Sequence, residues 1–542
     1  MTPVRLPDMT RDSGANLSRG GVGGLMLVSS CLLLIFVTVL FFKVRGHDDG
    51  NFVYTLDDPY IHLAMGEQIS HFHYGINPGE AASPSSSILW PFLLAPFASS
   101  SFELYVPLML NVLFSFASVL LIAYAVGIWP PCAVRNWSQG WWMKLLTVLL
   151  LMFVANLVGL PFVGMEHSLQ VFLSIVCAVG LASAWNGGGV PFWCLAAAAI
   201  GPLVRYESLA VTVGVALVLA ATHHIGKAAA VLVAAVLPLL LFGFYLRHLG
   251  LPFLPTSVLI KGAQPAHATH LLAAVYEMLR LSYHTTRDSP DRWPLLALGV
   301  ILACFAVTDR DKTHRIILAA GVSVAFLQIA IGPFGWFYRY EVYALIFVTL
   351  LFCRSVSDSI VTYGPFILGL FLLASPYLEG VNRIAEASGE VYRQQFQMRR
   401  FIDDFYRKDV AVNDIGLTSF RRAPGVRILD VWGLGSVEVF NATDKSASWL
   451  EAIVARHHVG LAIIYPQFFQ IPLDWTPVGK MCDLNPVEII GGRCVVFYAT
   501  SPESVEEIRG DLVRFAPTLP KGVSLEFNPS RREGGLFIAQ PK

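Results

Sequence analysis

The sequence predicts an α-helical polytopic membrane domain, with about 11 transmembrane helices, followed by a soluble C-terminal α/β domain. Three observations lead to this prediction. Of the 542 residues, 55% are hydrophobic and 14% are charged, whereas an ordinary soluble protein is about 25% charged. Apolar runs long enough to cross a bilayer recur before residue 379. Residues 380–542 hold 19 of the 38 Lys/Arg and 19 of the 38 Asp/Glu, as expected of one soluble domain.

The same composition excludes several classes of function. A soluble enzyme and a disordered scaffold are inconsistent with a chain this apolar. The 38 basic and 38 acidic residues cancel, so no basic surface suggests nucleic acid as a partner. Membrane lipids are the expected surroundings of the apolar runs.

The first apolar run, 24–43, follows a polar tail that carries three arginines. Its apolar core is longer than that of a signal peptide and no cleavage pattern follows it, so we expect a retained span. Residues 1–23 then form a cytoplasmic tail. Ten further runs predict crossings at 104–128, 144–164, 167–185, 190–204, 207–221, 228–247, 293–308, 316–333, 337–353 and 361–377. The run 88–99 is short and carries Pro91 and Pro96, so we expect it to be re-entrant or interfacial.

Eleven crossings divide the chain into a membrane domain, 24–378, and an outer domain, 379–542. The basic clusters at 223–227 and 309–315 then fall on the cytoplasmic side, as the positive-inside rule prefers. The acidic and basic groups considered below all fall on the outer side.

The first outer loop, 44–87, carries the adjacent acids Asp57 and Asp58 directly before Pro59. Proline favours the first turn of a helix, and an aspartate before it is a good N-cap. Capping would give Asp58 a structural role at the start of the helix and leave Asp57 freer to act in chemistry. A cap does not need two carboxylates, however, and the pair is costly unless a cation or a reaction uses it. A general base or a metal-binding pair is the functional interpretation, and His62 follows on the same amphipathic helix.

The next segments of the loop carry no chemistry by composition. Residues 77–80 read Asn-Pro-Gly-Glu and predict a turn, and a serine-rich stretch, 83–87, leads to Trp90.

Four more polar groups interrupt apolar runs, and such residues are functional-site candidates by default. They are Glu166 with His167, Arg205 with Glu207, Lys261, and Tyr338 with Arg339 and Glu341. The alternative is snorkelling to the headgroups, with local pairs such as Arg205 and Glu207.

As a set, these groups suit a phosphate held beside an acid at the outer face. Lys261, Arg205 and Arg339 are expected to bind a lipid phosphate. Asp57 or Asp58 is expected to deprotonate an acceptor hydroxyl. Supporting substrate contacts are expected from Glu166, His167, Glu207, Tyr338, Glu341 and His62. A divalent cation, Mg²⁺ or Mn²⁺, is compatible with the acidic pair, but nothing in the sequence requires one.

Neither a Walker A sequence nor a dinucleotide-binding fingerprint is present. A transferase on the outer face without a nucleotide site needs an activated donor carried by a lipid.

These motifs, in this order, resemble the GT-C superfamily of integral membrane glycosyltransferases, and most of all bacterial arabinofuranosyltransferase-like members. The resemblance rests on Asp-Asp-x-x-Ile at 57–61, Asn-Pro-Gly-Glu at 77–80 and Gly-Met-Glu at 164–166. Arg-x-Glu at 205–207, Pro-x-x-x-x-x-Lys at 255–261 and Arg-Tyr at 339–340 also match, and the likeness extends to about residue 434.

The resemblance implies a GT-C-like membrane domain in a bacterial inner membrane, with its catalytic first loop outside. It implies inverting transfer from a polyprenyl-phosphate sugar, a pentose such as arabinofuranose being one candidate, to a cell-envelope glycan or lipid acceptor. It also implies a first-loop aspartate as the base and basic residues at the donor phosphate. No cofactor is required.

The C-terminal domain alternates short apolar strands with helical patterns, which predicts an α/β layer structure. Strands are expected at 410–413, 426–431, 461–465 and 494–498, and helices at 447–458 and 502–515. The domain could grip the acceptor, position the chain, or act as a structural cap. Cys482 and Cys494 either form a disulfide or remain free thiols.

Two other functions compete. A transporter or flippase of lipid-linked sugars would also explain charges at membrane level, but it predicts internal repeats that the sequence lacks. A non-catalytic assembly protein would leave those charges incidental.

Overall fold

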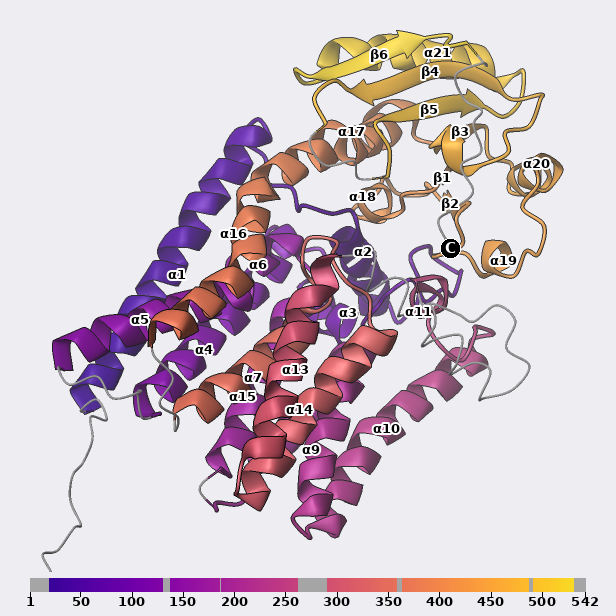
Figure 1. The fold of residues 1–542 in the computed structure, drawn as a ribbon. Coiled ribbons are helices and arrows are strands. Elements are labelled where there is room, and N and C mark those ends of the chain that lie inside the picture. The colour runs from indigo at the N-terminus through magenta and orange to yellow at the C-terminus, as the bar shows by residue number, and fades with distance from the viewer. Residues whose placement is uncertain are drawn as a thin grey trace, which may run out of the picture.

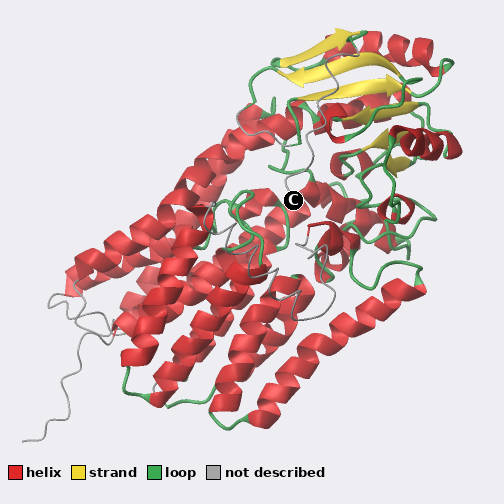
Figure 2. Cartoon of the chain, turned by 45° about the vertical axis from the view of Figure 1, so that its right-hand side comes forward, coloured by secondary structure: helices red, strands yellow, loops and turns green. Residues whose placement is uncertain are grey.

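The computed structural model describes residues 19–129, 137–185, 187–261, 290–357, 363–486 and 491–530. Helices run roughly side by side through most of the molecule, and a small sheet lies at one end (Figures 1 and 2). Among the described residues, five helices are long and apolar enough to cross a membrane by length and composition. They are α1 (Arg19–His47), α4 (Val106–Ile128), α10 (Ile225–His248), α14 (Lys312–Ile331) and α16 (Tyr363–Arg393).

Six shorter apolar helices complete the bundle. They are α5 (Trp137–Val154), α7 (His167–Ser183), α8 (Phe192–Val204), α9 (Leu209–Ala221), α13 (Trp293–Thr308) and α15 (Val342–Ser357). The membrane domain is therefore helical, while the count of eleven crossings stays a prediction.

The apolar run 144–164 is not the single span expected from the sequence. Helix α5 ends at Val154, and Asn156 takes a left-handed backbone with φ +48°. Its N–H donates to Phe153 O at 2.8 Å, while Leu157 N–H donates to Met152 O at 3.0 Å. This is a Schellman helix end, in which asparagine accepts the left-handed position. Only a short turn, α6 (Leu160–Val163), follows, so the chain is bent just before Glu166.

The short run 88–99 agrees with the expectation that it does not cross the membrane, whereas the predicted boundary between the two domains differs from the structure. Residues 88–99 form α3 (Leu89–Leu94) and one 3₁₀ turn, η1 (Ala95–Phe97); six helical residues reach only about 9 Å and cannot cross a bilayer. Helix α16 continues through residue 378, where the sequence placed the domain boundary, and leads into α17 (Gln395–Arg400) and the π-helical turn η5 (Phe401–Tyr406). A succession of three helical elements therefore joins the bundle to the sheet.

The C-terminal domain contains a six-stranded mixed sheet of order β2-β1-β3-β5-β4-β6. The strands are β1 (Val410–Val412), β2 (Ile428–Asp430), β3 (Leu461–Ile464), β4 (Thr476–Asp483), β5 (Cys494–Ala499) and β6 (Val523–Phe527). β1, β2 and β3 are parallel, and the other pairs are antiparallel. The four expected strands are confirmed; β4 and β6 were not foreseen.

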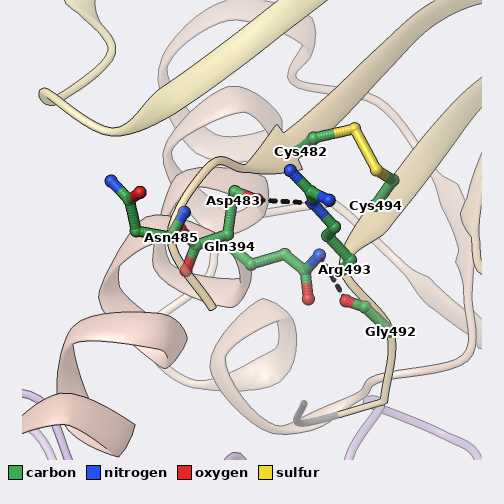
Figure 3. The surroundings of a disulfide bond; sticks show 7 residues. All are labelled: Gln394, Cys482, Asp483, Asn485, Gly492, Arg493 and Cys494. Atoms are coloured by element: carbon green, nitrogen blue, oxygen red, sulfur yellow. Dashed lines mark hydrogen bonds between the residues drawn. A yellow bond between two sulfur atoms is a disulfide. The ribbon is translucent and has the colours of Figure 1, made fainter. Parts of the chain in front are cut away.

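Helices cover both faces of this sheet. α21 (Ser504–Phe515) buries Leu512 and Phe515 with Met481 and Phe497 on one face. α20 (Ala447–Arg456) covers the other. Both helices are confirmed, and the domain is an α/β layer structure. Cys482 and Cys494 lie opposite each other in β4 and β5 and form a disulfide (Figure 3), which decides the alternative that the sequence left open.

The first outer loop packs against this sheet domain rather than standing alone. Asn77 Nδ2 donates to Ile428 O at 2.8 Å, and Ile428 N–H donates to Asn77 Oδ1 at 3.1 Å, so the side chain pairs with edge strand β2 as another strand would. Glu80 forms an ion pair with Arg427 at 2.9 Å. The turn at 77–80 therefore holds the loop to the C-terminal domain.

Candidate functional site

The acidic pair lies at the start of α2 (Asp58–Ser70), and the carboxyl group of Asp57, at the N-cap position, makes no capping hydrogen bond to that helix. The Asp57 carboxylate instead accepts backbone N–H groups from the sheet domain, Gly416 N at 2.7 Å and Leu417 N at 2.8 Å. Both donors lie at the start of the short helix α18 (Gly416–Ser419). The expectation from capping was therefore wrong, because it considered only the local helix: Asp57 is the residue with a structural contact, and it joins the two domains.

A third carboxylate lies close to this junction. Burial raises the pKa of Asp57 to about 8, and the charge of Asp414 adds to that shift. Burial also raises the pKa of Asp414, whose carboxylate is held by Gln395 Nε2 at 2.9 Å and by the Tyr465 hydroxyl at 2.9 Å. The negative charge of Asp58 adds to the rise in the pKa of Asp414, because like charges disfavour the ionised form of each other.

Asp58 points toward the membrane domain. Its Oδ2 accepts a hydrogen bond from Arg339 Nη2 at 2.8 Å, with the Asp58 side chain 24% exposed and Arg339 only 1% exposed. The same Nη2 lies 2.8 Å from the Tyr340 hydroxyl, and Arg339 Nη1 contacts Met165 Sδ at 3.0 Å. A buried guanidinium of this kind needs a charged partner, so Asp58 and Arg339 hold each other in place.

A second ion-pair group lies beside the first. Arg205 Nη1 contacts Glu166 Oε1 at 2.7 Å. Its Nη2 and Nε contact the two carboxylate oxygens of Glu207 at 2.7 and 3.2 Å, the fork geometry that arginine favours. Glu166 is fully buried; it also accepts the Ser86 hydroxyl at 2.9 Å and lies 3.5 Å from His62 Nε2.

Tyr340 connects the two groups. The Arg339 guanidinium lies 4.8 Å from the centre of its ring and the Arg205 guanidinium lies 5.3 Å from it, within cation–π range. Residues drawn from five separate segments of the chain therefore meet in one cluster. We call it the outer cluster, after the side of the membrane that the sequence predicts for it: Asp58, His62, Ser86, Glu166, Arg205, Glu207, Arg339 and Tyr340.

The outer cluster carries three carboxylates against two guanidinium groups. Each guanidinium predicted to bind phosphate already has a carboxylate partner. Among the described ranges, no group of three or more His, Cys, Asp or Glu side chains is arranged to hold a metal ion. The arrangement can activate a hydroxyl at Asp58, and it can stabilise a nearby anion with Arg339.

The remaining predicted residues are placed less centrally. His167 is buried, with its ring 5.9 Å from that of Tyr340. Glu341 and Tyr338 lie apart from the cluster and both contact Tyr377: Glu341 accepts its hydroxyl at 3.2 Å, and Tyr338 packs its ring against the Tyr377 ring.

Lys261 ends α11 (Thr256–Lys261), and its side chain falls outside the described structure. The backbone of α11 is anchored beside the cluster. Ser257 Oγ donates to Ser85 O at 2.6 Å, and Thr256 Oγ1 lies 2.9 Å from Ser83 O. The helix that carries Lys261 is therefore tied to the same serine-rich stretch that contacts Glu166.

Sequence reasoning missed four contributors. Ser85 contacts His62 Nδ1 at 3.0 Å, and Ser86 contacts Glu166, although the serine-rich stretch was given no chemistry. Tyr340 entered only through the Arg-Tyr motif at 339–340, and Asp414 was assigned no role. Composition carries no signal for such roles, because serine in a loop is common and its partner lies far away in sequence.

Comparison with known proteins adds little beyond this geometry. A family model described as a domain of unknown function, DUF8728, matches residues 384–498, which include the strands around Asp414. No curated protein matches. Among solved structures, the crystal structure of the Archaeoglobus fulgidus oligosaccharyltransferase in the apo form matches with 10% sequence identity and a TM-score of 0.35. That match covers 90% of this chain and 75% of the other, and at this level of similarity it supports no argument about function.

Proposed function

We propose that the protein is an inverting glycosyltransferase that moves a sugar from a polyprenyl-phosphate donor to a cell-envelope glycan or lipid acceptor on the outer face of a bacterial inner membrane. The observation that carries the proposal is the outer cluster, in which a partly exposed carboxylate, Asp58, contacts a buried guanidinium, Arg339. The motif order that resembles GT-C enzymes and the absence of a nucleotide-binding motif from the sequence point to the same lipid-carried donor.

In the proposed reaction, Asp58 is the general base. It accepts the proton of the acceptor hydroxyl as that oxygen attacks the anomeric carbon of the donor sugar. The bond from the anomeric carbon to the phosphate oxygen breaks, and the polyprenyl phosphate leaves with the electron pair. Attack from the face opposite the leaving group inverts the anomeric centre.

The phosphate of the donor gains negative charge as its bond to the sugar breaks, and cations next to the phosphate stabilise that charge. Lys261 and Arg339 are the proposed ligands, because α11 is anchored beside the cluster and Arg339 lies next to Asp58. Arg205 is bound on both sides by Glu166 and Glu207, so we assign it to positioning Glu166 and Tyr340 rather than to direct phosphate binding.

Asp57 is proposed to position Asp58. Its two backbone contacts to α18 hold the start of α2 against the sheet domain. No divalent cation enters this reaction, because Asp57 contacts α18 and Asp58 contacts Arg339, so the two carboxyl groups do not face one another as a pair of metal ligands.

The test is sugar transfer by purified, reconstituted protein from a panel of polyprenyl-phosphate sugars that includes a pentose. Asp58→Asn should lower the rate by about 10²-fold or more, since a positioned general base contributes about 10²–10⁴-fold. Lys261→Gln should raise the donor KM. Glu451→Gln, on the exposed face of α20, is the matched control and should have no effect.

Transfer that survives Asp58→Asn in a correctly folded protein would refute the assignment of the base. Movement of intact lipid-linked sugar across the bilayer without transfer, measured in the same vesicles, would replace the proposal with the transporter.

A further inference from the structure

Arg339 directly follows a turn of unusual backbone, residues 335–338, which we call the left-handed turn. All four of its φ angles are positive: Gly335 +73°, Trp336 +49°, Phe337 +63° and Tyr338 +50°. The Arg339 N–H donates to Gly335 O at 3.4 Å and closes the turn. Residues other than glycine adopt this conformation singly and at a cost, so a run of three is strained and persists only where its surroundings hold it.

Asn156 holds two carbonyl groups of the left-handed turn. Its Nδ2 donates to Tyr338 O at 3.3 Å and to Phe337 O at 3.4 Å, and an amide nitrogen carries one hydrogen for each of two acceptors. Asn156 is buried and is itself the left-handed residue that ends α5. One side chain therefore joins the end of a helix to the turn before Arg339.

The amide of Asn156 fits closely over Gly159. A Cβ atom at residue 159 would lie 2.4 Å from Asn156 Oδ1, closer than two such atoms can approach. The φ angle of Gly159 is −83°, a value that any residue adopts. The close approach of the amide, and not backbone freedom, is therefore the reason that a residue without a side chain fits here.

The left-handed turn also packs against the segments that carry the acids of the site. Phe337 packs against Leu56 and Met165. These two residues directly precede Asp57 and Glu166 in the chain. A displacement of the turn would therefore move the cation and disturb the backbone beside the acids together.

We propose that Asn156 is a positioning residue of the outer cluster, which fixes the guanidinium of Arg339 against Asp58 by holding the left-handed turn. The 2.8 Å contact between Arg339 Nη2 and Asp58 Oδ2 depends on the place of this backbone, because Arg339 follows it directly. What Arg339 does in sugar transfer rests on the function proposed above; the coupling of Asn156 to the ion pair does not.

The first test is equilibrium unfolding of the full chain in mixed micelles. Asn156→Gly removes the amide contacts but keeps the helix end, since glycine adopts a positive φ freely. In a double-mutant cycle with Asp58→Asn, the unfolding equilibrium constants should show a coupling of about ten-fold. Gly159→Ala is a second variant, which displaces the amide without removing it and should show coupling of the same sign.

His223→Gly is the matched control. His223 is an exposed left-handed residue, φ +64°, just after the end of α9 that lies away from Arg205. That helix ends with the same pair of backbone hydrogen bonds as α5, here at 3.1 and 2.8 Å. The substitution reproduces the entropy cost of a new glycine and should show no coupling to Asp58→Asn.

Transfer supplies a readout that a merely structural role would not move. Withdrawal of Arg339 leaves the proposed base, Asp58, without its cation, which disfavours the ionised form of the carboxyl group. The acid limb of the pH dependence of kcat/KM should therefore shift to higher pH in Asn156→Gly and Gly159→Ala. It should keep its position in His223→Gly.

Absence of coupling in both Asn156→Gly and Gly159→Ala, or equal coupling in His223→Gly, would overturn the proposal. An active enzyme whose acid limb does not move in the first two variants would overturn it as well. Coupling in the unfolding experiment together with a wild type that transfers no sugar would refute only the proposed function.

Discussion

Glu166 offers the sharpest test of the outer cluster, because it is fully buried and has two cationic or ionisable neighbours. Arg205 Nη1 lies 2.7 Å from its Oε1, and His62 Nε2 lies 3.5 Å from its Oε2. Glu166→Gln keeps the shape of the side chain and the hydrogen bond from Ser86, but it removes the charge. The variant therefore isolates the electrostatic contribution.

The expected magnitude follows from burial. Breaking a buried ion pair destabilises a protein by about 3–5 kcal/mol, because the remaining charge is left without a partner. Arg205 is 6% exposed at its side chain and keeps Glu207, so we expect the lower end, about 3 kcal/mol. The control is Glu207→Gln. Glu207 is 23% exposed, and water can replace part of its interaction, so we expect about 1 kcal/mol.

The assay is equilibrium unfolding in mixed micelles, followed by tryptophan fluorescence, for the two single variants and for each combined with Arg205→Gln. The double-mutant cycle should give a larger coupling free energy for Glu166 with Arg205 than for Glu207 with Arg205. Equal losses in the two single variants, or a smaller loss for Glu166→Gln, would refute the view that burial sets the strength of this cluster.

Three further predictions concern the contact between the domains and the sheet. First, burial against the sheet domain raises the pKa of Asp57 from 3.8 to about 8. Between these pH values Asp57 is protonated while the loop contacts α18 and ionised when the loop has separated from it. The contact should therefore weaken as the pH rises from about 4 to about 8, by at most about 1.4 kcal/mol per pH unit. Hydrogen exchange at α18 should show this slope, and Asp57→Asn should abolish it. Second, Asn77→Ala removes both hydrogen bonds to Ile428 and should cost about 2 kcal/mol in unfolding experiments, whereas an unchanged midpoint would show that the loop docks without them. Third, replacing Cys482 and Cys494 with serine removes a disulfide that joins residues 12 positions apart and should lower the stability of the sheet domain by about 3 kcal/mol. The measurement is the thermal unfolding midpoint, and the wild type with its disulfide reduced, which should unfold at the same lowered midpoint, is the control.

Much of the fold follows from the sequence because apolar length and alternation are local properties. The apolar runs became helices, and the short apolar segments of the C-terminal domain became β1, β2, β3 and β5. β4 was not predicted because Pro477, Gly479 and Lys480 interrupt its apolar pattern. The strand forms nevertheless, because it pairs with β5 on one side and β6 on the other. The end of a helix was not predicted where the backbone conformation of a single residue terminates it, as that of Asn156 does for α5.

The candidate site, like the fold, could be predicted from the sequence only in part. The sequence alone shows which charged residues are unusual, because a carboxylate or guanidinium beside an apolar run is costly wherever it lies. It could not determine their partners: Asp58 and Arg339 are separated by 281 residues, and Asp57 and Gly416 by 359. Local capping rules could not predict these contacts, since they count only contacts within one helix. The contact of Asp57 with α18 and the contact of Asp58 with Arg339 follow from the tertiary structure. Hydrogen bonds and ion pairs form between groups that packing brings within a few ångströms, whatever their distance along the chain.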